Sequence, residues 1–312
     1  MEYLLLLIGI AGLVVGGESL VRSAVGLNMR FKLSPLLIGT TVVSFGTSAP
    51  ELIVSINAVL GGNSSIAVGN VIGSNVANIG LVLAITILLR TLIVKGNKYL
   101  WSWILMIVSS LMFFLFSLDY VISSFEGIIL LLGLITFIWL SIRREMNPGD
   151  NNDFIEGVNN KKISSLWIIL YFIVGAIGLF FGSKLLISNA VIIAKTMGVS
   201  DFIIGISVVA LGTSLPELVT SVIAISKGQN SISIGNLLGS NIFNVFAVLG
   251  VTSIIKPLNI GPFLLAIDLP IMIGFIIVLG LFMFIGKRLG VIEGLTLLVA
   301  YFSYMAYSFG FF

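Results

Sequence analysis

The sequence GTSAPE at residues 46–51 recurs almost unchanged as GTSLPE at residues 212–217. Both copies stand in long apolar stretches, so each places a glutamate, Glu51 or Glu217, in a segment typical of a membrane-spanning helix. A charged side chain near the centre of a bilayer costs about 2.5–3.5 kcal/mol on insertion scales, and such residues usually serve a function. Two such carboxylates in two copies of one motif predict a single cation site built from both halves of the chain.

The composition indicates a polytopic membrane protein. The chain has 312 residues, of which 58% are hydrophobic and only 9% charged, whereas soluble domains carry about 25% charged residues. There is no cysteine and no histidine, which excludes disulfides, the usual zinc and haem sites, and catalysis by either residue. We therefore expect a protein that is not an enzyme, holds no organic cofactor and binds no nucleic acid.

Apolar runs between polar or Gly/Pro breaks give ten candidate spans, each close to the 20 residues or so that cross a bilayer. They are 3–25, 34–60, 66–88, 100–118, 122–142, 165–190, 200–226, 232–255, 263–285 and 291–311. If the N-terminus is outside, 13 of the 16 basic residues fall on the cytoplasmic side and 3 outside. Because cytoplasmic loops are enriched in Lys and Arg, we expect a multi-pass protein of the cell (plasma) membrane with both termini extracytoplasmic.

The two copies belong to an internal repeat. The offset is constant (217 − 51 = 166), and residues 33–86 align with 199–252 without a gap. Gly, Pro, Ser, Asn and Glu all match in this register, including Pro50 with Pro216 and Asn78 with Asn244. Each half has five spans, so the second copy enters the membrane from the opposite side, as in many secondary transporters.

The predicted fold class is an all-α membrane protein with ten transmembrane helices in two inverted five-helix repeats. The first repeat is 1–142, a cytoplasmic linker is 143–163, and the second, inverted repeat is 164–312. Proline lacks a backbone donor and clashes with the carbonyl four residues earlier, so Pro50 and Pro216 should disturb their helices. We expect helices 2, 3, 7 and 8 to be discontinuous around an ion site at the midplane.

The candidate ligands are all oxygen donors. Thr47 and Ser48 precede Glu51 by four and three residues, so the three share a helix face. Thr213, Ser214 and Glu217 repeat that arrangement, and the next span in each half supplies Ser74 with Asn78, or Ser240 with Asn244. Such a set suits Na⁺, Ca²⁺ or Mg²⁺ rather than soft transition metals, and a dry site with two carboxylates favours Ca²⁺ over Mg²⁺.

Other polar residues have simpler interpretations. We expect Thr41, Ser55 and Ser221 to bond back to carbonyls of their own helices, and Asn75 and Asn241 either to hold helices together or to belong to the site. Acidic residues near span ends should be solvated; they are Asp119, Glu126, Asp201, Asp268 and Glu293. Glu18 and Lys184 occupy equivalent repeat positions (184 − 18 = 166) and could pair.

The pattern G-T-S-x-P-E followed by G-N-x-x-G-S-N-x-x-N, present twice, resembles the α-repeats of the calcium/cation antiporter superfamily, and in particular of prokaryotic sodium/calcium exchangers. The resemblance covers nearly the whole chain. It implies that Glu51 and Glu217 bind both Ca²⁺ and Na⁺, with main-chain carbonyls from Thr47 and Thr213. It also implies that the sodium sites use Ser48, Ser214, Ser74 and Ser240, with the carbonyls of Ala210 and Ser44, and that Asn78 and Asn244 complete the centre.

One departure bears on the coupling ion. Several members of that family carry Asp at the position of Asn244, whereas both copies here have Asn. Only Glu51 and Glu217 then titrate, which favours sodium over the proton as the counter-ion. The linker also lacks the calcium-sensing domains of animal exchangers.

These features predict a secondary active antiporter that exchanges Na⁺ for Ca²⁺ by alternating access and functions as a monomer in the lipid bilayer. The alternatives are a Ca²⁺/H⁺ or Na⁺/H⁺ antiporter and, in other classes, a cation channel or an intramembrane enzyme. A channel usually builds its filter by oligomeric symmetry, and an enzyme here would have only the two glutamates to use.

Overall fold

The computed structural model describes residues 1–94, 98–145, 163–198, 212–286 and 288–308. Nearly all of these residues are helical. In the first half the elements are α1 (Glu2–Phe31), α2 (Pro35–Ile38), η1 (Gly39–Val43), α3 (Ser44–Leu60), α4 (Ser64–Ala77), η2 (Asn78–Leu83), α5 (Ala84–Leu89), β1 (Leu92–Ile93), α6 (Leu100–Phe116), β2 (Val121–Ile122) and α7 (Ser124–Glu145). In the second half they are α8 (Ser165–Thr196), α11 (Leu215–Ser226), α12 (Asn230–Phe243), η4 (Asn244–Leu249), α13 (Gly250–Ile255), β3 (Leu258–Asn259), η5 (Leu264–Asp268), α14 (Leu269–Ile285), β4 (Arg288–Leu289) and α15 (Val291–Ser308).

Membrane-spanning helices account for most of this structure. Eight helices in the described ranges are long and apolar enough to cross a membrane, and α6 and α11 are shorter apolar helices. These elements coincide with the ten expected spans within a few residues, although 199–211 of the seventh span lie outside the described residues. The spans formed by α4–η2–α5 and by α12–η4–α13 are the most buried of the eight, so they make up the centre of the protein.

The internal repeat is visible element by element. The bounds of α4, η2 and α5, moved by 166 residues, are the bounds of α12, η4 and α13, as in 64 + 166 = 230 and 89 + 166 = 255. The repeat extends beyond the motif itself. Glu126 accepts a hydrogen bond from the Ser123 backbone N–H at the start of α7, and Glu293 accepts one from Gly290 at the start of α15. Each carboxylate satisfies a free helix N-terminus. Both residues are also partly exposed, in keeping with the expectation that they are solvated.

Short strands join the two halves. Strand β1 pairs antiparallel with β4, and β2 pairs antiparallel with β3. In each pair one strand comes from the first half and the other from the second. The outer helices of each half are therefore tied to the opposite half.

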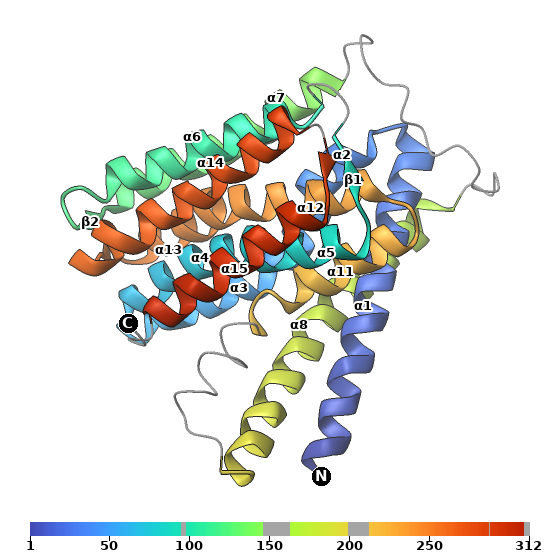
Figure 1. The fold of residues 1–312 in the computed structure, drawn as a ribbon, viewed down its shortest axis with the longest axis horizontal. Coiled ribbons are helices and arrows are strands. Elements are labelled where there is room, and N and C mark those ends of the chain that lie inside the picture. Colours follow the sequence, from blue (N-terminus) through green and yellow to red (C-terminus); the bar gives the residue numbers. More distant parts are fainter. Residues whose placement is uncertain (95–97, 146–162, 199–211, 287, 309–312) are drawn as a thin grey trace.

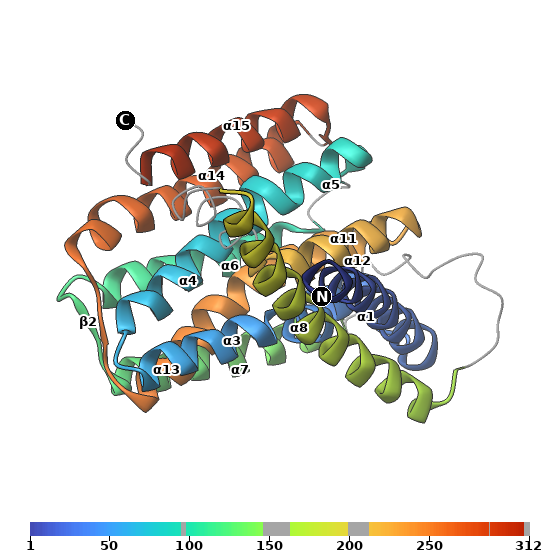
Figure 2. The same cartoon turned by 90° about the horizontal axis from the view of Figure 1, so that it is seen from below.

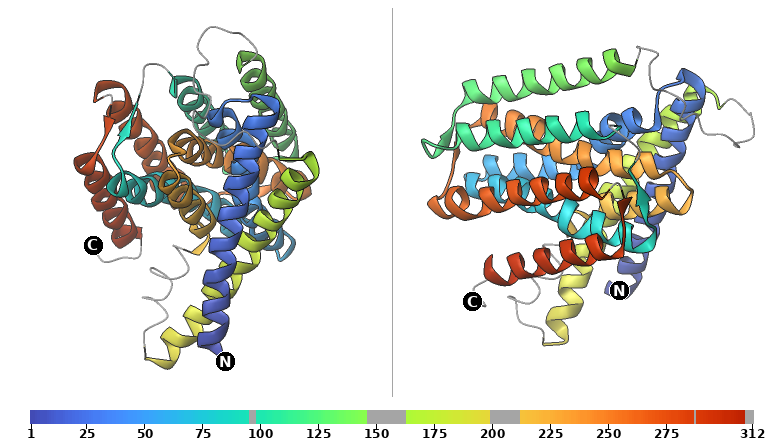
Figure 3. Two further views of the ribbon diagram at one scale, coloured as in Figure 1. Left: turned by 90° about the vertical axis from the view of Figure 1, so that its right-hand side faces the viewer. Right: turned by 45° about the horizontal axis from the view of Figure 1, so that its top comes forward.

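Helices α1 and α8 form a separate, obliquely placed pair (Figures 1 and 3). Viewed from below, the pair lies across the block formed by the other helices, with α14 and α15 along one edge of that block (Figure 2). Glycines allow the pair to approach closely, since a Cβ added at Gly182 would lie 2.6 Å from the Leu13 backbone nitrogen. Small residues at such crossings are typical of membrane helix pairs.

The predicted helix interruptions take the form of π-helical turns. They occur as η1 in the second span, η2 in the third and η4 in the eighth, and α3 continues through Pro50. The described part of the seventh span begins its helix at Leu215, directly before Pro216. A further π-helical turn, η5, stands in the ninth span, which was not expected to be interrupted. Pro270 follows this turn and clashes with the carbonyl four residues earlier. Such turns are frequent at functional sites.

Candidate cation-binding site

The repeated residues meet at the centre of the structure. Glu51 lies on α3 and Glu217 on α11, and the two residues are 1% and 0% exposed. Asn78 and Asn244 stand where α4 and α12 change into π-helix. Almost all the predicted ligands in the described residues are buried: Ser44, Thr47, Ser48, Glu51, Ser74, Asn78, Ser214, Glu217, Ser240 and Asn244.

Many polar atoms of this group have no hydrogen-bond partner among the described residues. They are both carboxylate oxygens of Glu51, Oε2 of Glu217, the hydroxyls of Ser74 and Ser214, both amide atoms of Asn78 and Oδ1 of Asn244. A buried polar group left without a hydrogen bond costs about 1–3 kcal/mol, and more when it is charged. A concentration of unpaired polar atoms on residues from both repeats is what a binding site for a desolvated cation requires.

Hydrogen bonds cross between the repeats at Glu217. The hydroxyls of Ser48 and Ser240 donate to its Oε1 at 3.3 and 3.4 Å. The Thr47 hydroxyl lies 3.0 Å from Asn236 Oδ1, to which it donates, and 3.2 Å from the Ser240 hydroxyl. The second glutamate is thus held by side chains of both halves, which leaves its other oxygen available.

Asn75 fixes the orientation of Asn244. Its Oδ1 accepts a 3.0 Å hydrogen bond from Asn244 Nδ2, while its own Nδ2 donates to the Asn241 carbonyl at 3.3 Å. The amide of Asn244 therefore turns its unpaired oxygen away from Asn75. Asn75, which the sequence left between a structural role and a ligand role, acts here by orienting a predicted ligand.

Within the part of the chain that the structure describes, no positive side chain pairs with either of the two glutamates. The ion pairs in the described ranges join Glu2 with the N-terminus and Glu18 with Arg22 and Lys227, and none includes Glu51 or Glu217. Carboxylates, amides and hydroxyls are hard oxygen donors, the kind that Ca²⁺ prefers and that Na⁺ also accepts. The arrangement is suited to binding one divalent or several monovalent cations.

Three predicted ligands need separate mention. Thr213 is partly exposed, in the turn that leads into α11. Ser44 is buried, and its carbonyl accepts a 3.3 Å bond from the Thr47 hydroxyl. Ala210 lies outside the described residues. The structure thus brings Ser44 to the group and leaves Thr213 at its margin.

Several expectations about the surrounding polar residues were wrong. Only Thr41 bonds back to its own helix as expected, at Leu37, whereas the Ser55 and Ser221 hydroxyls accept hydrogen bonds from Asn70 and Asn236. Asp268 is only 6% exposed and accepts a 3.0 Å bond from the Tyr304 hydroxyl.

Glu18 does not pair with Lys184. It pairs instead with Arg22 and Lys227. These two contacts join it to the next turn of α1 and to the end of α11.

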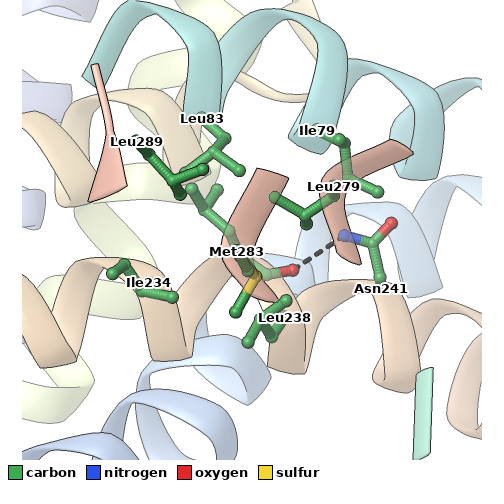
Figure 4. A pocket seen from close by; sticks show the side chains of 9 residues that line it. Ile79, Leu83, Ile234, Leu238, Asn241, Leu279, Met283 and Leu289 are labelled. Atoms are coloured by element: carbon green, nitrogen blue, oxygen red, sulfur yellow. Dashed lines mark hydrogen bonds between the residues drawn. The ribbon is translucent and has the colours of Figure 1, made fainter. Parts of the chain in front are cut away.

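A small apolar cavity lies beside the group, between η2, α12 and α14 (Figure 4). Asn241 is its one polar lining residue, and its Nδ2 donates to the Leu237 carbonyl at 2.8 Å. The remaining walls are aliphatic or thioether side chains. A hydrated cation gains nothing from such walls, so the cavity is not a candidate cation site.

Fold and site together define a membrane cation exchanger. The chain belongs to the sodium/calcium exchanger protein family, whose model matches residues 1–143 and 167–310. It is 34% identical to the "Putative antiporter CaxA" of Alkalimonas amylolytica, with 96% of this chain and 95% of the relative covered. It is 29% identical to "Sodium/calcium exchanger MaX1" of Methanosarcina acetivorans, with 99% and 98% covered. Among solved structures it is similar to the sodium-calcium exchanger NCX_Mj soaked with zero Na⁺ and Ca²⁺, at a TM-score of 0.84 and 27% identity over 98% of both chains.

Proposed function

We propose that this protein exchanges Na⁺ for Ca²⁺ by alternating access, with Glu51 and Glu217 as the shared ligands of both ions. The observation that carries the proposal is the pair of buried carboxylates with three unpaired oxygens and no cationic partner in the described residues. Two negative charges match one Ca²⁺ ion. Because sodium ions use the same carboxylates, loading with one ion excludes the other, which is the requirement for exchange.

The other ligands divide between the two halves. Ser48, Ser74 and the carbonyls of Thr47 and Ser44 come from the first repeat. Ser214, Ser240 and the carbonyls of Thr213 and Ala210 come from the second. Asn78 and Asn244 complete the centre as neutral amides, which supports sodium rather than the proton as the coupling ion. The relatives named for sodium and calcium exchange, MaX1 and NCX_Mj, support the same choice.

The repeat supplies the two access states. Residues 1–142 and 164–312 form the two inverted halves, joined by the linker 143–163, and an exchange of their conformations moves the opening from one face to the other. The distribution of basic residues supports a plasma-membrane protein with both termini outside. All candidate ligands come from one chain, so we propose that the monomer is the functional unit.

Calcium flux into proteoliposomes under separate ion gradients tests the function. An outward Na⁺ gradient should drive ⁴⁵Ca²⁺ uptake, and a pH gradient alone should not. Uptake driven by the pH gradient would identify a Ca²⁺/H⁺ antiporter, Na⁺ flux driven by that gradient a Na⁺/H⁺ antiporter, and single-channel currents a channel. Hydrolysis of a supplied peptide or ester would identify an enzyme.

Two conservative variants test the site. Glu51→Gln and Glu217→Gln keep the size of each side chain and remove its charge, and each should abolish Na⁺-driven uptake. Glu2→Gln, at the exposed start of α1, serves as a matched control and should transport normally. Retained exchange in both site variants would contradict the ligand assignment.

A further inference from the structure

Two buried side-chain amides form a hydrogen-bonded chain that leads from α14 to the candidate ligand Asn244. Asn244 donates from Nδ2 to Asn75 Oδ1 at 3.0 Å. Asn75 in turn donates from its Nδ2 to the main-chain carbonyl of Asn241 at 3.3 Å and to Sδ of Met272 at 3.6 Å. All four residues are at most 1% exposed. These bonds therefore decide how each amide is oriented.

The far end of the chain fixes its direction. A side-chain amide has an oxygen that only accepts and an NH₂ group that only donates, so its orientation follows from its partners. Both acceptors at the far end, a main-chain carbonyl and a thioether sulfur, are unable to donate. If Asn75 turned over, its own oxygen would face these two acceptors and both bonds would be lost. Asn75 must therefore point Oδ1 toward Asn244.

The orientation of Asn75 sets that of Asn244. Because Asn75 offers it an oxygen, Asn244 must use its Nδ2 for this bond, which leaves its Oδ1 unpaired. An amide oxygen is a good ligand for a hard cation. The NH₂ group carries partial positive charge on its hydrogens and cannot act as such a ligand. The direction of the chain thus determines whether Asn244 attracts or repels a cation.

The second copy of this asparagine shows that the residue type alone does not orient its neighbour. Asn241 stands at the position of Asn75 in the other repeat (241 − 166 = 75). Its Nδ2 donates to the Leu237 carbonyl of its own helix (Figure 4), and its Oδ1 has no partner among the described residues. The equivalent ligand, Asn78, is listed with neither amide atom bonded in that same part of the chain. Asn75 differs because its two acceptors belong to other helices, α12 and α14.

We infer that Asn75 and Met272 are positioning residues that make Asn244 present its oxygen, and not its NH₂ group, to the bound cation. The inference rests on the proposed function, since it takes Asn244 as a ligand of the exchanged ions. It adds a role for α14, which carries none of the candidate ligands. The sulfur of Met272 serves there as a hydrogen-bond acceptor for the chain and not only as a packing group.

Two variants of Asn75 test the first step. Asn75→Leu removes the acceptor and lets Asn244 turn over, so Ca²⁺ affinity should fall about tenfold. Asn75→Asp keeps an oxygen that accepts from Asn244 in either protonation state, so its affinity should stay within about threefold of the unmodified protein. Equilibrium binding of ⁴⁵Ca²⁺ to the purified full chain without Na⁺ measures both, and thermal midpoints report on folding. If Asn75 were only structural, a buried carboxylate would harm binding at least as much as leucine, and that order would overturn the inference.

Methionine variants on α14 test the second step. Met272→Leu nearly keeps the volume and removes the sulfur acceptor, so Ca²⁺ affinity should fall about threefold while the maximal uptake rate is unchanged. Met283→Leu is the matched control, because Met283 is also buried on α14 but lines the apolar cavity. It should bind Ca²⁺ normally. Equal affinities for the two leucine variants would remove Met272 from the inference.

The double variant Asn75→Leu/Met272→Leu separates hydrogen bonding from packing. Once the Asn75 amide is absent, the sulfur has nothing to accept, so the double variant should bind Ca²⁺ as Asn75→Leu does. Losses that add would show that Met272 acts by packing alone and would overturn its assignment. The methionine pair also decides the matter if Asn75→Leu does not fold.

Failure of this inference is distinguishable from failure of the proposed function. Normal Na⁺-driven Ca²⁺ uptake by the unmodified protein, with the wrong order of affinities among the variants, would overturn the inference alone. Ca²⁺ binding in the expected order, without Na⁺-driven uptake, would overturn the exchange and leave the roles of Asn75 and Met272 supported.

Discussion

The hydroxyl of Ser48, in the first repeat, donates a 3.3 Å hydrogen bond to the carboxylate of Glu217, in the second. The two residues are 169 positions apart in sequence, and both are buried. The glutamate of one half is therefore oriented by the motif of the other half, and neither repeat contains a complete site. This dependence leads to specific consequences for variants of the site and its supports.

Ser48→Ala should weaken cation binding without unfolding the protein. The variant loses one of two hydroxyls that hold Glu217, and also one candidate oxygen ligand. With Ser240 still in place, we expect a loss of about 1 kcal/mol, or roughly fivefold in the Ca²⁺ concentration for half-maximal uptake. The Ca²⁺ dependence of Na⁺-driven uptake measures this effect, with exposed Ser226→Ala as control. An unchanged Ca²⁺ dependence would show that the hydroxyl does not contribute.

Asn244→Asp should make exchange sensitive to pH. The substitution adds a third carboxylate at a buried position. In the unmodified protein the Asn244 Oδ1 atom receives no hydrogen bond from Asn75, which instead accepts one from Asn244 Nδ2. Crowded, buried carboxylates bind protons more readily, and a protonated group is a poor cation ligand. Uptake by the variant should therefore fall as pH decreases through the weakly acidic range, while the unmodified protein changes less. Parallel pH profiles for the two proteins would contradict this prediction.

Gly182→Ala should destabilise the crossing of α1 and α8. The added Cβ would lie 2.6 Å from the Leu13 backbone nitrogen, and backbone cannot move aside as a flexible side chain can. Overpacking of this kind costs about 1–3 kcal/mol. Thermal unfolding in detergent should show a lower midpoint than for Gly274→Ala, whose added methyl group has space. Equal midpoints would mean that α1 and α8 move apart to accommodate the added methyl group at no cost in stability.

Lys227→Gln should have little effect on stability. Lys227 and Glu18 form an ion pair between the end of α11 and α1, but their side chains are 39% and 28% exposed. Arg22 remains bonded to Glu18 at 2.7 Å in the variant. Exposed pairs contribute about 0.2–1 kcal/mol, and salt screens them. The shift in thermal midpoint should be small at low salt and vanish at high salt; a large shift that persists would indicate a different role for Lys227.

The sequence was sufficient to predict the helical spans and the repeat that relates them, and most of the candidate ligands in the described residues are buried. The offset of 166 could be measured directly from Glu51 and Glu217, and it recurs in the bounds of α4 and α12. Apolar run lengths located the spans because a bilayer imposes one length on each of them. Burial of the predicted ligands follows from the same argument, since they stand near the middle of those runs.

Pairing between side chains could not be predicted in the same way. The role of Asn75 depends on Asn244 lying 3.0 Å away, and the burial of Asp268 depends on Tyr304 of a later helix. Nothing in either local sequence encodes such contacts. The two glutamates show a more fundamental limit. Two copies of one motif predict equal surroundings, yet among the described residues Glu217 accepts hydrogen bonds from two serines and Glu51 accepts none at its carboxylate.

The two-residue strands give the architecture a further property. Because β1 pairs with β4 and β2 with β3, each half recognises the other at two separate places through backbone bonds that do not depend on the linker. In terms of assembly, the two halves resemble the subunits of a heterodimer that have been joined in one polypeptide. If the two halves are expressed as separate chains, they should therefore associate in one defined alignment with each other. An ancestor of half the length would have needed to insert into the membrane in both orientations to build the same site.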